Sequence, residues 1–207
     1  MNVTVLGATG RTGRPLVERL RESGHEVTAV VREPARAPEG THVVVGDVRD
    51  RSVLVRALTG ADAVVSALGP RGRGDDVHRA LVARLIPAMQ MTGVRRYVGV
   101  GGAGTDVPGD RKRPRDRVIS RATRVLGGAV VADKAGELAA WRDSDLDWTV
   151  VRPPRLVDGS ATGRVEHDAR VSTRSTRMRR ADLAAFLVEV LEQDLYVRRA
   201  PFAATAG

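Results

Sequence analysis

Seven residues near the start of the chain carry the clearest chemical signal. The run Gly7-Ala8-Thr9-Gly10-Arg11-Thr12-Gly13 lies between a short apolar stretch, 3–6, and a segment with helical periodicity, 14–23. Glycines at i, i+3 and i+6 allow a sharp turn, a close approach of a pyrophosphate to the backbone, and tight packing of a helix on a strand. Amides at the start of that helix can then hold the phosphates. The pattern predicts a dinucleotide-binding turn, and the alternative is a purely structural turn.

The residues after the second apolar stretch bear on the choice of cofactor. NAD sites usually place an acidic residue about 20 positions after the glycine motif, where it binds the ribose 2′-hydroxyl. Here Val31 is followed by Arg32 and Glu33, with Arg36 close behind. A guanidinium suits a 2′-phosphate, and Glu33 lies one position too late for the ribose. We therefore predict NADP(H) in preference to NAD(H), bound by Arg32 and Arg36, unless both arginines are simply solvated.

Two further strand ends predict contacts with the rest of a dinucleotide. Asp47 and Val48 close the third apolar stretch, where an acid and an apolar neighbour can bind the adenine amino group and cover its ring. An N-cap or turn for the next helix explains Asp47 equally well. After the fourth stretch, the backbone of Ala67, Leu68 and Gly69 would pass near the pyrophosphate and the nicotinamide ribose.

The elements that must position these residues alternate along the chain. Apolar patterns predict strands at 3–6, 26–31, 42–48, 63–68, 97–100 and 148–151, and helices at 14–23, 51–58, 75–91, 130–142 and 181–193. A further edge strand is expected within 196–203. This order predicts an α/β fold: a doubly wound parallel sheet, Rossmann-like, in three layers. We expect one domain over 1–207, in which two long segments form a rim over the substrate side. The segment 103–128 is irregular, and 155–176 is either irregular or contains short strands.

Composition excludes several classes of protein. The 207 residues suit one domain, and the absence of cysteine excludes disulfide scaffolds, thiolate metal sites and a cysteine nucleophile. The four histidines lack metal-binding spacing, so no metal is predicted. No stretch approaches the ~18 apolar residues of a membrane span, and no basic segment precedes an apolar one at the N-terminus. The prediction is a cytoplasmic protein without a membrane partner, either a monomer or a weak homodimer.

The net charge of +9 has two interpretations. It describes either a solvated basic surface or a field that attracts anions, such as a phosphorylated cofactor or an acidic substrate. Aromatic residues make up only 3% of the chain, which leaves little base stacking, and no nucleic-acid-binding motif is present. We therefore predict a small-molecule partner, with an anionic acceptor as one option, and no nucleic acid. The basic run within 111–124 either attracts that anion or forms a solvated loop.

The chain resembles the atypical short-chain dehydrogenase/reductase group, and within it the NAD(P)H-binding flavin reductase/biliverdin reductase B-like proteins. The matching stretches are GATGRTG at 7–13, VVREPAR at 30–36, HVVVGDV at 42–48, DAVVSALGP at 62–70 and DLDWTVVRPPRL at 145–156. The last helix, from Arg180, is also similar. The resemblance implies an extended NADPH across the sheet edge. Its phosphates would be lined by Gly7, Thr9, Gly10, Arg11, Thr12 and Gly13. Leu68 and Gly69 would follow the ribose, Val100, Pro153 and Pro154 would pack near the nicotinamide, and His78, Gly102 and Arg155 would face the substrate.

Part of that group's catalytic machinery is missing from this sequence. Typical short-chain dehydrogenases pair a tyrosine with a lysine four residues later, so that the tyrosine relays a proton. Lys134 stands at the lysine position, but Val130 replaces the tyrosine, and Gly102 replaces a serine that often follows the fifth strand. Hydride transfer to a flavin, quinone or similar conjugated acceptor does not need that acid. We predict this reductase activity with Lys134 as the candidate catalytic residue; the alternatives are a solvated Lys134 and an NmrA-like NADP(H) sensor without turnover.

Overall fold

The computed structural model describes residues 1–69, 72, 75–118, 120 and 128–207, and its centre is a six-stranded parallel sheet. The strands lie in the order β3-β2-β1-β4-β5-β6. The first three strands extend the sheet to one side of β1 and the last three extend it to the other, so the strand order reverses between the neighbours β1 and β4. Ligands of open α/β sheets bind at the carboxyl ends of the strands beside such a reversal. The strands are β1 (Asn2–Leu6), β2 (Glu26–Val31), β3 (His42–Val45), β4 (Ala63–Ser66), β5 (Arg96–Val100) and β6 (Asp147–Val151).

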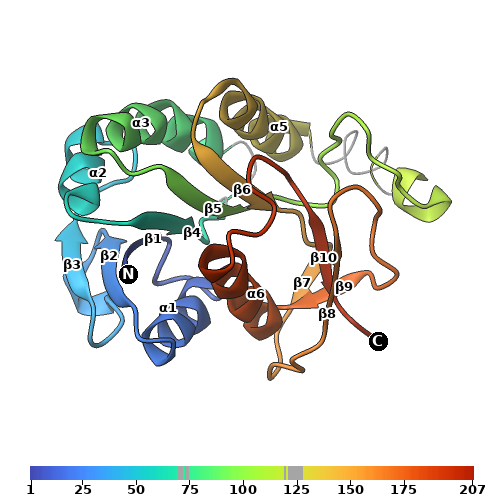
Figure 1. Ribbon diagram of the computed structural model, residues 1–207, viewed down its shortest axis with the longest axis horizontal. Helices are drawn as coiled ribbons and strands as arrows, with labels where there is room; N and C mark the ends of the chain where they lie inside the picture. Colours follow the sequence, from blue (N-terminus) through green and yellow to red (C-terminus); the bar gives the residue numbers. More distant parts are fainter. Residues whose placement is uncertain (70–71, 73–74, 119, 121–127) are drawn as a thin grey trace.

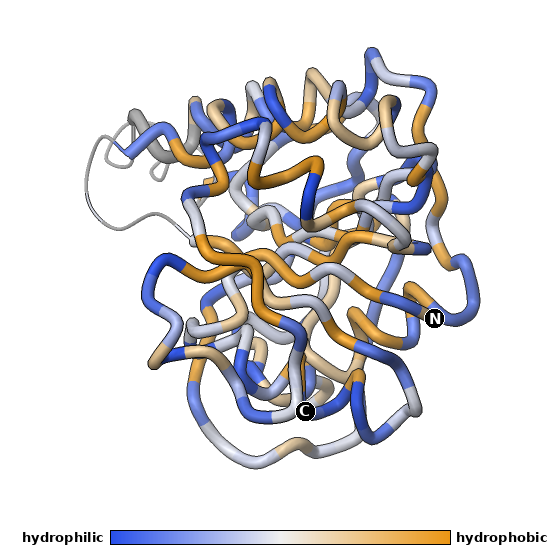
Figure 2. The backbone as a smooth tube through the Cα atoms, turned by 90° about the vertical axis from the view of Figure 1, so that its left-hand side faces the viewer, coloured by the Kyte–Doolittle hydropathy of each residue, from blue (hydrophilic) through white to orange (hydrophobic). Residues whose placement is uncertain are grey.

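Helices cover both faces of the sheet, which confirms the predicted doubly wound, three-layer fold. Figure 1 shows α1 (Gly13–Glu22) and α6 (Arg180–Glu192) together on one face, and α2 (Arg51–Leu58), α3 (Val77–Thr92) and α5 (Gly128–Asp143) on the other. Each face has its own apolar core, and Val5 and Leu6 of β1 contribute to opposite ones. Successive strand residues point to opposite faces, so a strand covered twice is apolar throughout. The apolar tube through the middle of Figure 2 is this sheet.

Side-chain carboxylates fix the starts of two helices on the second face. Asp50 is the N-cap of α2, and its side chain accepts a hydrogen bond from the Ser52 amide at 2.7 Å. The start of α3 is capped from outside the helix: Asp133 of α5 accepts from the amides of His78 and Arg79 at 3.0 and 2.9 Å. These bonds satisfy amides that have no acceptor within their own helix. They also hold α3 against α5.

The C-terminal third adds two small sheets, and here the predicted edge strand is confirmed in part. β7 (Arg155–Val157) pairs in parallel with β9 (Arg177–Arg179), and β8 (Val165–Asp168) pairs antiparallel with β10 (Phe202–Thr205). The expected edge strand at 196–203 runs beside β6, through parallel bridges of Thr149 with Arg199 and of Arg152 with Phe202 and backbone hydrogen bonds, but its regular part, β10, begins only at Phe202. From Phe202 onward the backbone pairs with β8 instead of the main sheet.

The two rim segments contain regular structure: short strands are one of the two outcomes expected for 155–176, whereas no helix was expected within 103–128. The segment 155–176 includes β7 and β8, and residues 114–118 and 120 are helical. A short 3-10 helix, η1 (Pro34–Arg36), follows β2. Within the described ranges, no helix is both long and apolar enough to cross a membrane.

Candidate nucleotide-binding site

The glycine-rich turn after β1 has no room for side chains at its key positions. Gly7 has a φ of 80°, and a Cβ there would lie 3.0 Å from backbone atoms of Ala67 and Leu68. A Cβ on Gly13 would lie only 2.0 Å from the carbonyl oxygen of Gly7. Thr12 is the N-cap of α1 but makes no side-chain cap hydrogen bond. The turn therefore packs directly against the start of α1. No described side chain caps this helix start; the Arg14 amide donates to the Gly10 carbonyl at 3.0 Å, and Pro15 has no N–H, so the amides of Thr12 and Gly13 are the candidates for an anion.

A crevice with an empty volume of about 510 Å³ opens beside this turn. Its walls come from the loops that follow β1, β2, β3 and β4, which places it at the carboxyl edge of the sheet where the strand order reverses. The sequence-predicted residues that line it are Gly7, Thr9, Arg32, Asp47, Val48, Leu68 and Gly69. The structure thus brings together residues from four separate stretches. A glycine turn, an arginine and an acidic residue followed by a valine are the lining expected around the adenosine half of a dinucleotide.

The two arginines predicted to bind a 2′-phosphate differ in position. Arg32 lines the crevice, is exposed, and has no side-chain hydrogen bond or ion pair to any described residue. Arg36 does not line the crevice, and its guanidinium lies 3.7 Å from the carboxylate of Glu33. The short helix η1 explains this, because it places Arg36 one turn after Glu33. Arg32 is therefore the better-placed cation.

Asp47 and Arg49 form a turn at the crevice wall. The Asp47 carboxylate accepts a hydrogen bond from the Arg49 amide at 2.9 Å, while Asp50 caps α2. Arg49, which sequence reasoning missed, also lines the crevice and donates to Asp75 and Asp76 at 2.7 and 3.1 Å. Hydrogen bonds to these two carboxylates raise the pKa of Arg49, and the bond to Asp76 has the larger effect. No sequence signal separates it from the other arginines.

A second, mostly apolar pocket lies at the carboxyl ends of β5 and β6. Its empty volume is about 1120 Å³, and the predicted residues Gly102, Pro153, Pro154 and Arg155 line it. Val100 is buried in the core at the end of β5. Ala103, Gly104, Asp116, Ser120, Thr176 and Arg177 complete the lining. Both rim segments therefore supply residues to this pocket.

Lys134 is held at the end of β5. Its Nζ donates to the Gly101 carbonyl at 2.7 Å, and a Cβ on Gly102 would lie 3.8 Å from that nitrogen. Burial lowers the pKa of Lys134, and the carboxylates of Glu137 and Asp133 act in the opposite direction. The ammonium group of Lys134, the candidate catalytic residue, is therefore fixed beside Gly102, which stands in place of the family's serine.

His78 takes a different position from the one predicted. It is buried, and its Nδ1 lies 3.1 Å from the Glu137 carboxylate, which also accepts a hydrogen bond from the Tyr97 hydroxyl at 3.2 Å. His78 is absent from the lining of both pockets, because this side of α3 faces α5 rather than the sheet edge. Burial and the Glu137 charge raise the pKa of Tyr97 well above its usual value. The chain's other tyrosine, Tyr196, contacts His167, so neither tyrosine lines the second pocket.

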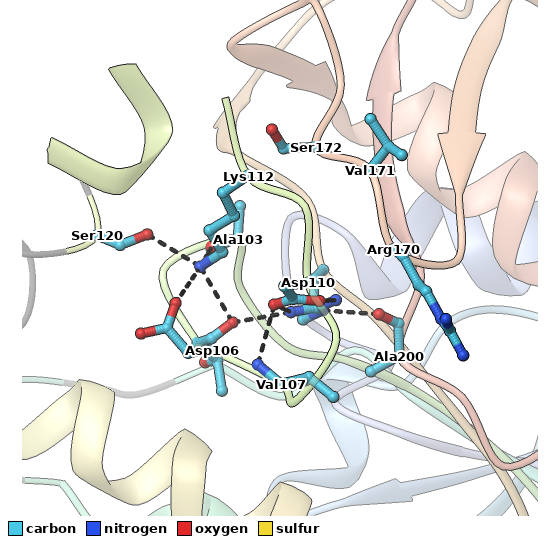
Figure 3. A network of polar contacts seen from close by, with 12 residues as sticks. Ala103, Asp106, Val107, Asp110, Lys112, Ser120, Arg170, Val171, Ser172 and Ala200 are labelled. Atoms are coloured by element: carbon cyan, nitrogen blue, oxygen red, sulfur yellow. Dashed lines mark hydrogen bonds and ion pairs between the residues drawn. The ribbon is translucent and has the colours of Figure 1, made fainter. Parts of the chain in front are cut away.

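Two buried cations, Lys112 within the basic run and Arg152 after β6, organise the chain there, while the described arginines of the run are exposed. Lys112 donates to the Ala103 carbonyl, Asp106 and Ser120 at 2.7–2.9 Å (Figure 3). Arg152 bonds both oxygens of Asp110 at 2.6 and 2.8 Å and stacks on the Phe202 ring. These contacts tie the segment after β5 to β6 and β10. Residues 119 and 121–124 of the predicted basic run lie outside the described residues.

Two of the predicted phosphate-binding side chains are also accounted for. Arg11 is exposed and lies 3.7 Å from Asp158, whereas Thr12 is buried at the helix start.

Among the residues that the structure describes, no three His, Asp or Glu side chains gather as a metal site would require.

The fold and this site define a doubly wound nucleotide-binding protein. A model of the NAD(P)H-binding family matches residues 7–194, and the chain belongs to that family. The predicted resemblance to atypical short-chain dehydrogenases/reductases is thereby confirmed. The match includes the glycine turn, the crevice and the second pocket.

Known relatives and solved structures agree with this assignment. A 3-diazoavenalumate denitrifying reductase from a Streptomyces species is 40% identical over 47% of this chain and 36% of its own length. A (4-alkanoyl-5-oxo-2,5-dihydrofuran-3-yl)methyl phosphate reductase from Streptomyces griseus is 32% identical over 73% of the chain and 46% of its own length. The chain therefore spans less than half of these curated relatives. A provisionally assigned NADH-flavin reductase from Streptococcus pneumoniae superposes with a TM-score of 0.81, at 26% identity and complete coverage of both chains.

Proposed function

We propose that this protein is an NADPH-dependent reductase that transfers a hydride to a flavin, quinone or similar conjugated small molecule. The observation that carries the proposal is the pairing of two sites at one edge of the sheet. A crevice beside the glycine turn suits a dinucleotide, and an apolar pocket beside Lys134 suits a flat acceptor. Two relatives named as reductases, and a structural neighbour assigned to flavin reduction, support this interpretation.

The cofactor would lie extended along the carboxyl edge. The amides at the start of α1 would hold its diphosphate, Arg32 its 2′-phosphate, and Asp47 with Val48 its adenine. The backbone of Ala67, Leu68 and Gly69 would follow toward the nicotinamide. When bound, the reduced nicotinamide supplies the hydride.

The chain's own residues would orient the acceptor and exclude water. Pro153, Pro154 and Gly102 present apolar surface to a ring, which favours contact between flat donor and acceptor. Lys134 would hold a ribose hydroxyl from its position beside Gly101. No tyrosine lines the pocket, so we assign the proton to solvent.

Two arginines on the pocket wall favour an acceptor that carries a negative charge. Arg155 of β7 and Arg177 of β9 are register partners, and both line the pocket. Neither side chain has a hydrogen bond or ion pair within the described part of the chain. The one carboxylate among the described lining residues, Asp116, is paired with Arg115 and Ser172, so the two guanidiniums would attract a phosphate or carboxylate. This argument favours FMN over riboflavin.

The direct test is oxidation of NADPH by the purified protein. We expect loss of the reduced-nicotinamide absorbance with FMN or a quinone, and a smaller kcat/KM with riboflavin. The double variant Arg155→Gln/Arg177→Gln should weaken FMN and leave riboflavin unchanged. Absence of turnover with the whole panel of acceptors would contradict the reductase proposal.

The cofactor preference has its own test. Arg32→Ala should weaken NADPH by about 1–3 kcal/mol, as the loss of a charged hydrogen bond does, and leave NADH nearly unchanged. Arg36→Ala is the matched control, because Arg36 pairs with Glu33 outside the crevice. Equal losses for both cofactors in Arg32→Ala would reject the assignment.

A specific observation also favours a second function, an NADP(H)-responsive sensor. Val130 and Gly102 stand where typical dehydrogenases carry the catalytic tyrosine and the serine, and both tyrosines of the chain lie away from the pocket. Tight NADP(H) binding together with an absence of turnover would support the sensor.

A further inference from the structure

A basic groove lies beside β6, apart from the nucleotide crevice and the acceptor pocket. Its empty volume is about 780 Å³, and Trp148 of β6 forms part of its wall. None of its lining residues belongs to the cofactor crevice or the acceptor pocket. Four arginines from three different segments converge on it: Arg142, Arg170, Arg198 and Arg199.

The positive charge of this groove is not neutralised by its own residues. Asp110 is the one carboxylate in the lining, and Arg152 occupies both of its oxygens, at 2.6 and 2.8 Å. Among the four arginines, Arg198 alone has a side-chain partner within the described chain, the Ser144 carbonyl. Four like charges around one hollow repel one another, and an anion with several charges would relieve that repulsion.

The walls that carry these arginines are held in place by backbone hydrogen bonds. The Arg170 amide donates to Asp168 at 2.7 Å, and its carbonyl accepts from the Arg111 amide at 2.8 Å. Figure 3 shows the Arg170 side chain pointing away from the Lys112 network. On the other wall, the Arg198 amide donates to the Trp148 carbonyl at 2.7 Å. The site is therefore built before a ligand arrives.

Backbone strain is concentrated next to the same wall. Asp194, Tyr196 and Arg198 have φ values of 50°, 57° and 57°, a backbone conformation that residues other than glycine rarely adopt. Such strain persists where surrounding contacts enforce it, and it gathers at binding sites. It turns the chain so that Arg198 and Arg199 both reach the groove.

Trp148 contributes to this wall from β6, and its side chain is buried. The four arginines give the groove an excess of hydrogen-bond donors over acceptors, because Asp110 already pairs with Arg152. From these observations we infer that the groove binds a compact polyanion carrying two or more phosphate or carboxylate groups, at a site independent of the cofactor.

The test is calorimetric titration of the full chain at constant ionic strength, with and without saturating NADP⁺. Tripolyphosphate is the phosphate probe and citrate the carboxylate probe. The groove variant is Arg142→Gln/Arg199→Gln. The control variant is Arg84→Gln/Arg164→Gln, which removes the same charge from two exposed arginines outside the groove.

We expect one binding site for at least one probe, retained in NADP⁺, and weakened by about tenfold or more in the groove variant. The control variant should lose less than about twofold, because it changes only the long-range field. In a Trp141→Phe protein, Trp148 is the sole tryptophan, and its emission should change on binding. Absence of binding at millimolar probe, equal losses in both variants, or displacement by NADP⁺ would overturn the inference. Because NADPH turnover is measured separately, failure here leaves the proposed function untouched.

Discussion

Replacing Gly13 with alanine tests whether the close approach of α1 to the first turn builds the nucleotide crevice. The new Cβ would lie 2.0 Å from the Gly7 carbonyl oxygen, 2.8 Å from the Gly7 carbonyl carbon and 2.9 Å from the Ala8 carbonyl carbon. All three atoms belong to the backbone, so no side chain can rotate to make room. A Cβ atom essentially never lies within 3.0 Å of another non-bonded heavy atom, so the helix start and the turn must separate by about 1 Å.

The expected cost follows from two opposing effects. Overpacking of this kind typically costs ~1–3 kcal/mol, while alanine offsets up to ~1 kcal/mol through its better helix propensity and lower chain entropy. We therefore expect Gly13→Ala to lower the free energy of unfolding by about 1–2 kcal/mol. Nucleotide affinity should fall by more than tenfold, because the amides of the turn move away from the phosphate position.

Urea denaturation and NADPH titration measure the two effects separately. Gly10→Ala is the graded comparison, since its Cβ would lie 3.2 Å from the same oxygen and needs a shift of only a few tenths of an ångström. Its loss of stability should be less than about 1 kcal/mol. If Gly13→Ala unfolds at the wild-type midpoint with an unchanged m-value and binds NADPH normally, the packing argument is wrong.

Three further substitutions probe the rim and the C-terminal sheet. Gly102→Ser should keep the free energy of unfolding within about 0.5 kcal/mol of wild type, because the nearest atom to its Cβ is the Lys134 Nζ at 3.8 Å. Gly101→Ser should be the less stable of the two variants in the same urea denaturation, because its Cβ would lie 2.9 Å from the Val150 side chain. Arg152→Met should cost about 3–5 kcal/mol by leaving a buried Asp110 charge unpaired, and adding Asp110→Asn should restore part of that loss in a denaturation cycle. Burial disfavours the charged form of Asp182, but hydrogen bonds from Thr205, Thr162 and Gly163 outweigh it and lower its pKa. Its stabilising contribution is therefore complete above the unfolded value near pH 4 and lost as pH falls through the folded pKa, so Asp182→Asn should flatten the acid limb of a stability–pH curve.

Most of the main sheet could be predicted from local patterns. The helix at 51–58 has its predicted bounds, and the strands at 26–31 and 148–151 shift by one residue at most. Strands buried on both faces are apolar throughout, and that signal is local. The predicted ends of the third and fourth strands, at 48 and 68, lie beyond the observed ends, Val45 and Ser66. Their apolar patterns continue into the loops that line the crevice.

The positions of individual charged side chains were not predictable in the same way. Arg32 and Arg36 are equivalent in the sequence, yet one lines the crevice and the other pairs with Glu33. Lys112 belongs to a run that looks solvated, but it is buried beside Ser120. Such outcomes depend on which partners the fold brings within hydrogen-bonding distance, and local patterns carry no record of those partners.

Local sequence is enough to predict that a turn of three spaced glycines joins a buried strand to a helix. This requirement is local, because only glycine fits where the turn meets the helix start. Three features follow only from packing: His78 is buried against Glu137, β10 pairs with β8, and four arginines from three separate segments surround one groove. Each of these depends on contacts between segments far apart in the chain, whose geometry is set only when the helices and the small sheets pack together.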